Sequence, residues 1–368
     1  MKKKNIIKKL LSVVLSAATM FSLLTLPAHA IVPGEDAYIG TLNGIECIEV
    51  DLINHTERFI PKSDIPDFTG EGTYEALDIE TRIRMEKASA DIASAPAHQN
   101  DGELSPLDVT AGTYTFVKPT QYLYSGVVLL GIFENNKCVD WGTGFLIDED
   151  TVVTALHVFC DWAIDGVSDP SEDDGFYYSF DTSTITTADI RVFVDINEIH
   201  YDSINPSDSV TKKNACEALG TKASIPLTSV RYDPMVYTSD GDDDEYDWAI
   251  AKLATPITDD VYFWNCSVYN DNTMENAATY HVGYPLQFGL RMVEAYGRVY
   301  DSNATAGKTY FNTNSCNEGG MSGGPIYTPA SGVKCCGIGV QKYYGSHYTF
   351  AIKIYQRMLN IMTSYMNE

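Results

Sequence analysis

The stretch Gly320-Met321-Ser322-Gly323-Gly324-Pro325 decides the fold of this chain. Ser322 lies among small residues, and the glycine two positions before it lets the backbone curl tightly. In such a turn the N–H groups of Gly320 and Ser322 are expected to converge beside the serine hydroxyl. Two converging donors beside a hydroxyl form an oxyanion hole beside a nucleophile. An ordinary β-turn is the alternative for this stretch taken alone, so partners for the serine are needed.

A nucleophilic hydroxyl requires a base, and His157 is the histidine best placed to supply one. It ends the apolar run 151–157, which follows a second apolar run at 142–147. The acidic residues 148–150 between the runs predict a turn, so the two runs form a β-hairpin that delivers His157 to the end of a strand. A core histidine with satisfied hydrogen bonds is the alternative for His157 taken alone.

The third member of such a set is a carboxylate that fixes the imidazole tautomer and stabilises the imidazolium. Asp247 heads the apolar run 247–253, which predicts a strand with one acidic residue at its entrance. A strand-entry turn is the alternative for Asp247 alone. Three such segments in the order His157, Asp247, Ser322 favour a catalytic set over three unrelated structural roles.

These runs together resemble a chymotrypsin-fold serine protease, and within that fold the bacterial glutamyl endopeptidase (V8-like) branch. The stretch His281-Val282-Gly283-Tyr284-Pro285 resembles the strand and turn that this branch carries between its Asp and its Ser. The resemblance covers about residues 120–360. It implies an all-β fold of two antiparallel six-stranded β-barrels with the active site between them. It also implies peptide-bond hydrolysis through an acyl-enzyme, without a cofactor.

The composition agrees with this fold class. Hydrophobic residues make up 44% of the 368 residues, and many short β-branched runs are broken by Gly, Asn and Asp, as is typical of an all-β protein. The formal net charge of −25 excludes nucleic acid as an expected partner. The sequence has no pair of CxxC motifs and no helical HxxxH motif, so no metal site is indicated. We expect a monomer that acts on protein or peptide substrates.

The N-terminus predicts a secretion signal over residues 1–30. Five lysines precede an apolar stretch from Leu10 to Leu26, and Ala28-His29-Ala30 matches a cleavage site of small residues. Removing residues 1–30 changes the formal net charge from −25 to −30. An uncleaved membrane anchor is the alternative, but the apolar run is short for a span. We therefore expect an extracellular protein without stable membrane association.

Residues 31–105 differ in character from the rest, and we interpret them as a prosegment that precedes a protease domain at 106–368. A helix is predicted over 73–90, followed by a small and polar linker at 94–102. An N-terminal extension that stays attached is the alternative. Trypsin-type activation at Ile31 is excluded because the residue before the nucleophile is Met321, which cannot pair with a freed amine. At the other end, the spacing of apolar residues predicts a C-terminal helix with Ile354, Met358, Ile361 and Tyr365 on one face.

Eight cysteines in an exported chain indicate disulfide bonds. The resemblance implies a bridge between Cys138 and Cys160, which flank the His157 hairpin. Cys316 lies before Ser322 and the adjacent Cys335 and Cys336 lie after it, so one bridge near the pocket is expected but its partner stays open. Cys47, Cys216 and Cys266 remain, and reduced, buried thiols are the alternative for all eight.

The separation of 90 positions between His157 and Asp247 is about twice that of related enzymes. The excess predicts enlarged loops near the cleft that restrict substrates. The acidic run 242–245 offers oxygen ligands for calcium, but a solvated loop is the preferred interpretation because no EF-hand spacing is present.

The expected specificity pocket departs from the resemblance. The glutamyl-specific enzymes receive the substrate carboxylate with a His on the strand after the nucleophile and a Thr five positions before it. In this sequence Gly339 and Asn317 stand in those places, and Val340 is the next residue of the strand. Lys342 and His347 are the candidate replacement charges, with a surface position as the alternative for each. The preference for Glu therefore does not carry over.

Two other functions are considered. A catalytically silent, secreted binding module is the first, and the intact set of His157, Asp247, Ser322 and Gly320 speaks against it. A housekeeping protease with an appended peptide-binding domain is the second. Only 46 residues follow Ser322, which is enough for the last strands and a helix but not for a further domain.

Overall fold

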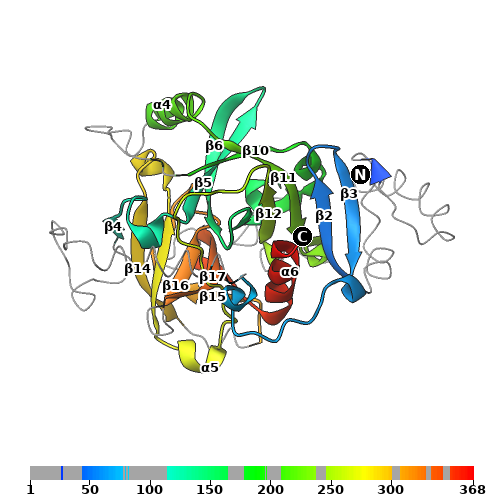
Figure 1. Cartoon of the computed structure of the whole chain (residues 1–368). Coiled ribbons are helices and arrows are strands. Elements are labelled where there is room, and N and C mark those ends of the chain that lie inside the picture. Colours follow the sequence, from blue (N-terminus) through cyan, green and yellow to red (C-terminus); the bar gives the residue numbers. More distant parts are fainter. Residues whose placement is uncertain are drawn as a thin grey trace, which may run out of the picture.

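The computed structural model (Figure 1) describes most of the chain from residue 44 onward. The described residues are 26–27, 44–77, 79, 82, 114–164, 178–194, 196, 209–237, 246–300, 307–328, 333–342 and 349–368. Within these ranges no helix has both the length and the apolar character needed to cross a membrane.

Six antiparallel strands close into a first barrel. Its order is β11-β10-β5-β6-β7-β12, and β12 pairs back onto β11 to close the ring. The strands are β5 (Val127–Glu134), β6 (Lys137–Leu146), β7 (Thr151–Thr154), β10 (Asp189–Phe193), β11 (Ile225–Tyr232) and β12 (Ala249–Leu253).

A second ring of six antiparallel strands follows along the chain. Its order is β13-β16-β17-β18-β15-β14, closed by the pairing of β13 with β14, and β4 adds to β14 outside the ring. The strands are β4 (Tyr114–Phe116), β13 (Ala278–Gly283), β14 (Val293–Tyr300), β15 (Tyr310–Thr313), β16 (Pro325–Thr328), β17 (Lys334–Lys342) and β18 (Thr349–Lys353). The expected pair of six-stranded barrels is confirmed.

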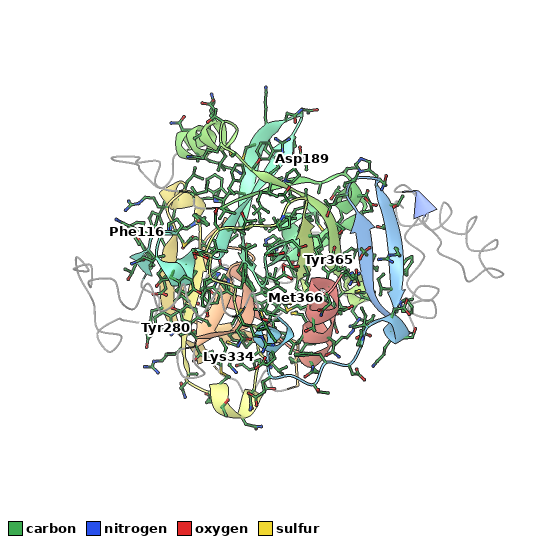
Figure 2. All side chains as sticks on the ribbon, viewed as in Figure 1. Phe116, Asp189, Tyr280, Lys334, Tyr365 and Met366 are labelled. Atoms are coloured by element: carbon green, nitrogen blue, oxygen red, sulfur yellow. The ribbon has the colours of Figure 1, made fainter. Side chains whose placement is uncertain are left out.

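The C-terminal helix is also confirmed, as α6 (Gln356–Met366). Its buried face includes Met358, Ile361 and Tyr365, as the spacing predicts. Tyr365 (Figure 2) lies under the guanidinium of Arg231 on β11, 4.1 Å from the ring centre, so α6 is fixed against the first barrel.

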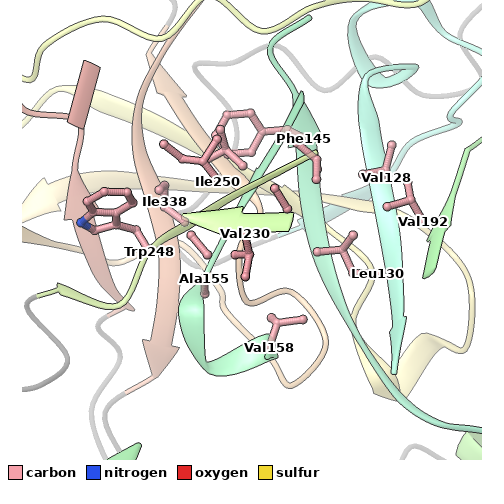
Figure 3. Close-up of a cluster of buried hydrophobic side chains, with 14 of the residues drawn as sticks. Val128, Leu130, Phe145, Ala155, Val158, Val192, Val230, Trp248, Ile250 and Ile338 are labelled. Atoms are coloured by element: carbon pink, nitrogen blue, oxygen red, sulfur yellow. The ribbon is translucent and has the colours of Figure 1, made fainter. Parts of the chain in front are cut away.

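Buried apolar side chains fill the first barrel. Phe145, Val152, Ile250 and Val230 have no exposed surface, and Figure 3 shows several of them in one cluster. Ile338 of β17 belongs to the same buried cluster although it comes from the second barrel. The two barrels therefore share one core, which fixes their relative position and with it the cleft between them.

The predicted hairpin around His157 is confirmed with a small shift. β6 and β7 pair antiparallel, with Gly144 opposite Thr154. His157 lies in a 3-10 turn, η5 (Leu156–Val158), directly after β7 rather than in the strand itself.

The described part of the expected prosegment packs against the first barrel. β2 (Ile45–Asp51) pairs with β11, and β3 (Thr56–Pro61) pairs with β2 and with β1 (Leu26–Pro27). Cys47, Ile48 and Val50 are fully buried there, so this segment contributes to the core. The chain then continues through η2 (Lys62–Asp64) to η3 (Thr73–Ala76), a 3-10 turn where the long helix was expected to begin. Most of residues 78–113, including the linker, lie outside the described residues.

The described parts of the long segment between His157 and Asp247 form secondary structure, while residues 165–177, 195, 197–208 and 238–245 lie outside the described residues, so the expected enlarged loops stay a prediction. The described parts supply β10 and β11 of the first barrel, the β8 (Asp161–Ile164) and β9 (Tyr178–Asp181) hairpin, and helix α4 (Ser209–Leu219). Short elements complete the description: η4 (Tyr122–Tyr124), η6 (Thr182–Thr187), η7 (Pro234–Tyr237), α5 (Asp271–Met274) and η9 (Leu286–Phe288). The acidic run 242–245 lies outside the described residues.

All eight cysteines are free thiols in this structure. The thiol of Cys138 hydrogen-bonds with that of Cys216 on α4, a contact that the sequence did not predict, and the expected bridge between Cys138 and Cys160 stays a prediction. Cys335 contacts Cys266 rather than Cys316. The two residues form a β-bridge and a hydrogen bond between their thiols. Sequence separation conceals both pairs because each joins segments that become neighbours only through the tertiary fold.

Candidate active site

Two consecutive turns hold Ser322 between β15 and β16. The N–H of Met321 donates to the carbonyl of Glu318 at 2.9 Å, and the N–H of Gly324 donates to that of Met321 at 3.0 Å. Gly320 has a φ of +91°, a conformation that residues with a side chain rarely adopt. A Cβ at Gly320 would also lie 2.5 Å from the carbonyl oxygen of Tyr284. Glycine is therefore required at the position that the sequence pattern singled out.

The first barrel fastens this turn through Thr143 of β6. The Thr143 N–H donates to the carbonyl of Ser322 at 2.8 Å, and the Thr143 hydroxyl donates to that of Gly320 at 2.7 Å. The same hydroxyl accepts the N–H of Tyr284 at 3.0 Å, while the indole of Trp141 donates to the Tyr284 carbonyl at 2.8 Å. The serine turn is thus positioned by both barrels at once.

The backbone around Ser322 leaves two N–H groups facing the cleft. The carbonyl of Gly319 accepts the N–H of Leu286 at 2.6 Å, and the described chain has no cis peptide bond. In a trans peptide the N–H points opposite to the carbonyl, so the N–H of Gly320 points away from Leu286. Within the described residues, neither Gly320 nor Ser322 donates its N–H to a backbone carbonyl, and both line the cleft. The pair is available to a negatively charged oxygen.

His157 and Asp247 are joined by two hydrogen bonds. Asp247 is fully buried, and its Oδ2 lies 2.6 Å from Nδ1 of His157. Its Oδ1 accepts the backbone N–H of His157 at 2.8 Å. Because an ionised carboxylate only accepts, Nδ1 carries the hydrogen and Nε2 keeps its lone pair. The expected pairing of these two residues across 90 positions is what the fold produces.

The segment beside Asp247 is anchored to the C-terminal helix. Trp248 is fully buried, and its indole N–H donates to the hydroxyl of Tyr355 at 3.0 Å. Tyr355 donates in turn to Asp233 at 2.9 Å, and Arg357 pairs with the same carboxylate at 2.8 Å. This network fixes the entrance of β12, and therefore the carboxylate that holds His157.

The hydroxyl of Ser322 donates to the carbonyl of Val340 at 3.0 Å in this structure. Ser322 and His157 line the same cleft, which has a volume of about 1070 Å³. A serine side chain has three staggered positions about its Cα–Cβ bond, so rotation moves the hydroxyl among them without moving the backbone. Other residues from both barrels and from the long segment line the cleft, among them Trp141, Val158, Cys160, Ala188, Lys212, Leu286 and Gly319.

Two of the expected specificity residues, Asn317 and Val340, line the cleft. Asn317 is 3% exposed and lines the cleft, and its side-chain oxygen has no hydrogen-bond partner among the described residues. Val340 lines the cleft as well. Gly339 is packed against the imidazole of His281 on β13, which lies so close that a Cβ at Gly339 would be 2.3 Å from Nε2. Lys342 ends β17, and His347 lies outside the described residues.

His281 lies beside the site, a position that the sequence analysis did not assign to it although it quoted the stretch that His281 begins. It is fully buried, and burial lowers the pKa of its imidazole to about 4, so the ring is neutral near pH 7. The carbonyls of Cys316 and Met321 face the ring, but neither ring nitrogen makes a hydrogen bond of ordinary geometry within the described residues. The ring occupies the volume that a side chain at position 339 would need, which explains why glycine stands there.

Comparison with known proteins agrees with this geometry. The model of the trypsin-like peptidase domain matches residues 142–338, which is more than half of the chain. No curated protein sequence shows a significant match.

Solved structures to which this chain is similar include three proteases. A Glu endopeptidase in complex with MPD is 16% identical, over 69% of this chain and 97% of that one, with a TM-score of 0.45. The protease Anisep from Arthrobacter nicotinovorans is 14% identical, over 65% and 96%, with a TM-score of 0.42. The Rv3671c protease from M. tuberculosis is 15% identical, over 62% and 76%, with a TM-score of 0.35. On the family match and its own two-barrel architecture, the chain belongs to the trypsin-like peptidase domain family.

Proposed function

We propose that this protein is a serine endopeptidase in which Ser322, His157 and Asp247 act together. One observation carries the proposal: the fold brings a buried His157–Asp247 pair and Ser322 into one cleft, where two backbone N–H groups have no backbone acceptor among the described residues. Each of these features has a structural explanation by itself. Their convergence from three separate segments is what acyl transfer requires.

In the first half of the reaction, Oγ of Ser322 attacks the carbonyl carbon of the scissile peptide bond. Nε2 of His157 accepts the hydroxyl proton, and the Asp247 carboxylate stabilises the resulting imidazolium through Nδ1. The carbonyl oxygen becomes negative and receives the N–H groups of Gly320 and Ser322. His157 then gives its proton to the leaving amine as the C–N bond breaks, which leaves an ester on Ser322.

In the second half, water attacks that ester while Nε2 of His157 again accepts a proton. Its return to Oγ of Ser322 releases the carboxylic acid product and restores the site. Before the first attack, the hydroxyl of Ser322 leaves the Val340 carbonyl and turns to His157. The double hold of Asp247 on His157 keeps the imidazole in place through both halves.

Covalent labelling tests this chemistry directly. A fluorophosphonate should modify the purified protein at Ser322, and Ser322→Ala should lower kcat/KM on a peptide by roughly 10³-fold or more. Ser315→Ala is the matched control, because that buried hydroxyl has no partner among the described residues and takes no part in the chemistry. It should retain labelling and activity. Labelling at another residue, or full activity of Ser322→Ala, contradicts the mechanism.

The catalytically silent binding module is the alternative, and the same experiment separates it. A folded parent protein that resists labelling and cleaves no peptide supports the alternative. The convergence of the His157–Asp247 pair, Ser322 and the two N–H groups in one cleft speaks against it, because a binding module requires none of them.

We also propose that the protein is exported and is cut between about residues 95 and 113. The basic and apolar N-terminus supports export, and the change of composition near residue 100 supports the cut. None of the described residues 44–77 lines the cleft, while Cys47 and Ile48 are fully buried against the first barrel. A cut in the linker therefore leaves the N-terminal fragment bound. N-terminal sequencing of protein purified from culture medium should find two chains, and an active single chain starting at Ile31 argues against the cut.

We further propose that selectivity for Glu over Gln before the scissile bond is modest. Gly339 supplies no side chain, Asn317 supplies a neutral amide, and the imidazole of His281 is neutral and buried behind Gly339. An unpaired carboxylate in such surroundings costs several kcal/mol. The measurement is kcat/KM on peptides that differ only in Glu, Gln, Leu or Phe. A Glu/Gln ratio above about 10³ overturns the proposal, and loss of that ratio in Lys342→Ala or His347→Ala would identify the cation responsible.

A further inference from the structure

Helix α4 lies beside strand β6 (Figure 1). It belongs to the long segment between His157 and Asp247. Its residue Lys212 lines the cleft, as do Val139, Asp140 and Trp141 of β6. The position of α4 therefore decides the shape of this part of the cleft.

Two contacts join the helix to the strand. The ammonium of Lys212 lies 2.5 Å from Oδ2 of Asp140. The thiol of Cys138 hydrogen-bonds with that of Cys216. Lys212 and Cys216 are four positions apart and lie on one face of the helix, about 6 Å apart along its axis. Cys138 and Asp140 flank an irregularity of β6, where they pair with the consecutive residues Phe133 and Ile132 of β5.

The two contacts hold neighbouring positions of α4 against the same part of β6. The ion pair is partly exposed, whereas the thiol contact is buried. Both cysteines are nearly buried, with 9% of Cys138 and 6% of Cys216 exposed. This buried contact makes the two thiols candidate partners for a disulfide bond.

We propose that Cys138 and Cys216 form a disulfide bond in the exported protein, which fixes α4 along the wall of the catalytic cleft. The Cys216 thiolate attacks one sulfur of an external disulfide, carried by a thiol–disulfide oxidoreductase, and releases one thiol of that carrier. The thiolate of Cys138 then attacks Cys216 and releases the second thiol. The two cysteines lose two protons and two electrons, and the carrier disulfide is reduced to two thiols.

The local chemistry favours this order of attack. The hydrogen bond from Cys138 lowers the pKa of the Cys216 thiol, and the positive charge of Lys212 acts in the same direction. The same hydrogen bond and burial raise the pKa of Cys138. Because the thiolate is the nucleophile in exchange, Cys216 reacts first.

Peptide mapping tests the bond without any reference to catalysis. The secreted protein is alkylated without reduction, digested and analysed by mass spectrometry. We expect one linked peptide pair containing Cys138 and Cys216. Cys216→Ser should lose the pair and leave Cys138 alkylated, while Cys160→Ser, the matched control, should keep it. A link between Cys138 and Cys160, or alkylation of both Cys138 and Cys216 in the folded secreted protein, overturns the proposal.

The consequence for the cleft rests on the proposed endopeptidase function. Cys216→Ser, or the parent treated with dithiothreitol, is compared with the oxidised parent on peptides extended toward either end of the scissile bond. We expect kcat/KM to change several-fold for peptides extended toward one end, with little change for short peptides. Labelling of Ser322 by a fluorophosphonate should persist, which separates this result from failure of the catalytic proposal. An equal change for all peptides shows that the bond does not shape the cleft.

Discussion

The substitution Gly320→Ala tests how the serine turn works. The Gly320 N–H is one of the two groups proposed to hold the oxyanion, and the residue has a φ of +91°. An added methyl group would lie 2.5 Å from the Tyr284 carbonyl oxygen, 2.9 Å from Trp141 Nε1 and 3.1 Å from the Leu286 nitrogen. All three neighbours belong to the hydrogen-bonded frame of the site, so none gives way without moving the turn.

Two magnitudes follow from this geometry. A side chain in the left-handed region costs about 1–2 kcal/mol, and overpacking against a fixed frame costs about 1–3 kcal/mol more. For a domain of this size, a loss of that order lowers Tm by on the order of 5–15 °C. Loss of one oxyanion donor costs about 3–4 kcal/mol in the transition state, which lowers kcat by about 10²–10³-fold with little change in KM.

Steady-state kinetics on a peptide substrate, together with a thermal melt, measure both effects. Gly307→Ala is the matched control, because Gly307 also has a positive φ, of +76°, but a Cβ there meets nothing within 4 Å. It should show only the backbone cost to stability and retain its kcat. If folded Gly320→Ala keeps a kcat within about threefold of the parent, its N–H does not hold the oxyanion, since the expected loss is at least about 10²-fold.

Two further perturbations test the electrostatics of the fold. The imidazole of His281 has a pKa of about 4 in the folded protein against 6.5 in the unfolded chain, so the unfolded state binds the proton first as the pH falls. The free energy of unfolding should therefore fall as the pH drops from 6.5 to 4, and the loss due to His281 is about 2.5 kcal/mol at pH 4.5. Urea unfolding of His281→Gln should lack this pH-dependent loss. An equal pH dependence in both proteins refutes the prediction. Arg231→Met should destabilise the protein by about 3 kcal/mol, because the buried guanidinium pairs at 2.6 Å with Glu49 of the N-terminal segment. Lys213→Met, which breaks an exposed pair with Glu217 at 3.8 Å, should cost less than about 0.5 kcal/mol in the same urea titration.

The features that the sequence predicted are those encoded by local pattern. The turn at Ser322 depends on glycines that adopt positive φ, and this backbone preference is a property of the few residues of the turn. The hairpin before His157 and the face of α6 follow from periods of two and of 3.6 residues. The order of His157, Asp247 and Ser322 then indicated the two-barrel fold through resemblance, and the closed rings of strands confirm it.

The features that required the tertiary structure join segments far apart in the sequence. Residues 45–51 showed no sign of pairing with β11, because a strand pattern does not name its partner. The imidazole of His281, on another strand, fills the space beside Gly339. A comparison of the sequence of β17 alone shows only that position 339 has no side chain.

The long segment between His157 and Asp247 shows the same limit. Its length predicted loops near the cleft, and its described parts supply two barrel strands and α4, which the sequence did not predict. The contact of Cys138 with Cys216 follows from the packing of that helix against β6. Local sequence determines the backbone preference of a segment and which of its side chains are buried. Which segment it packs against depends on the surfaces that become neighbours once the barrels close.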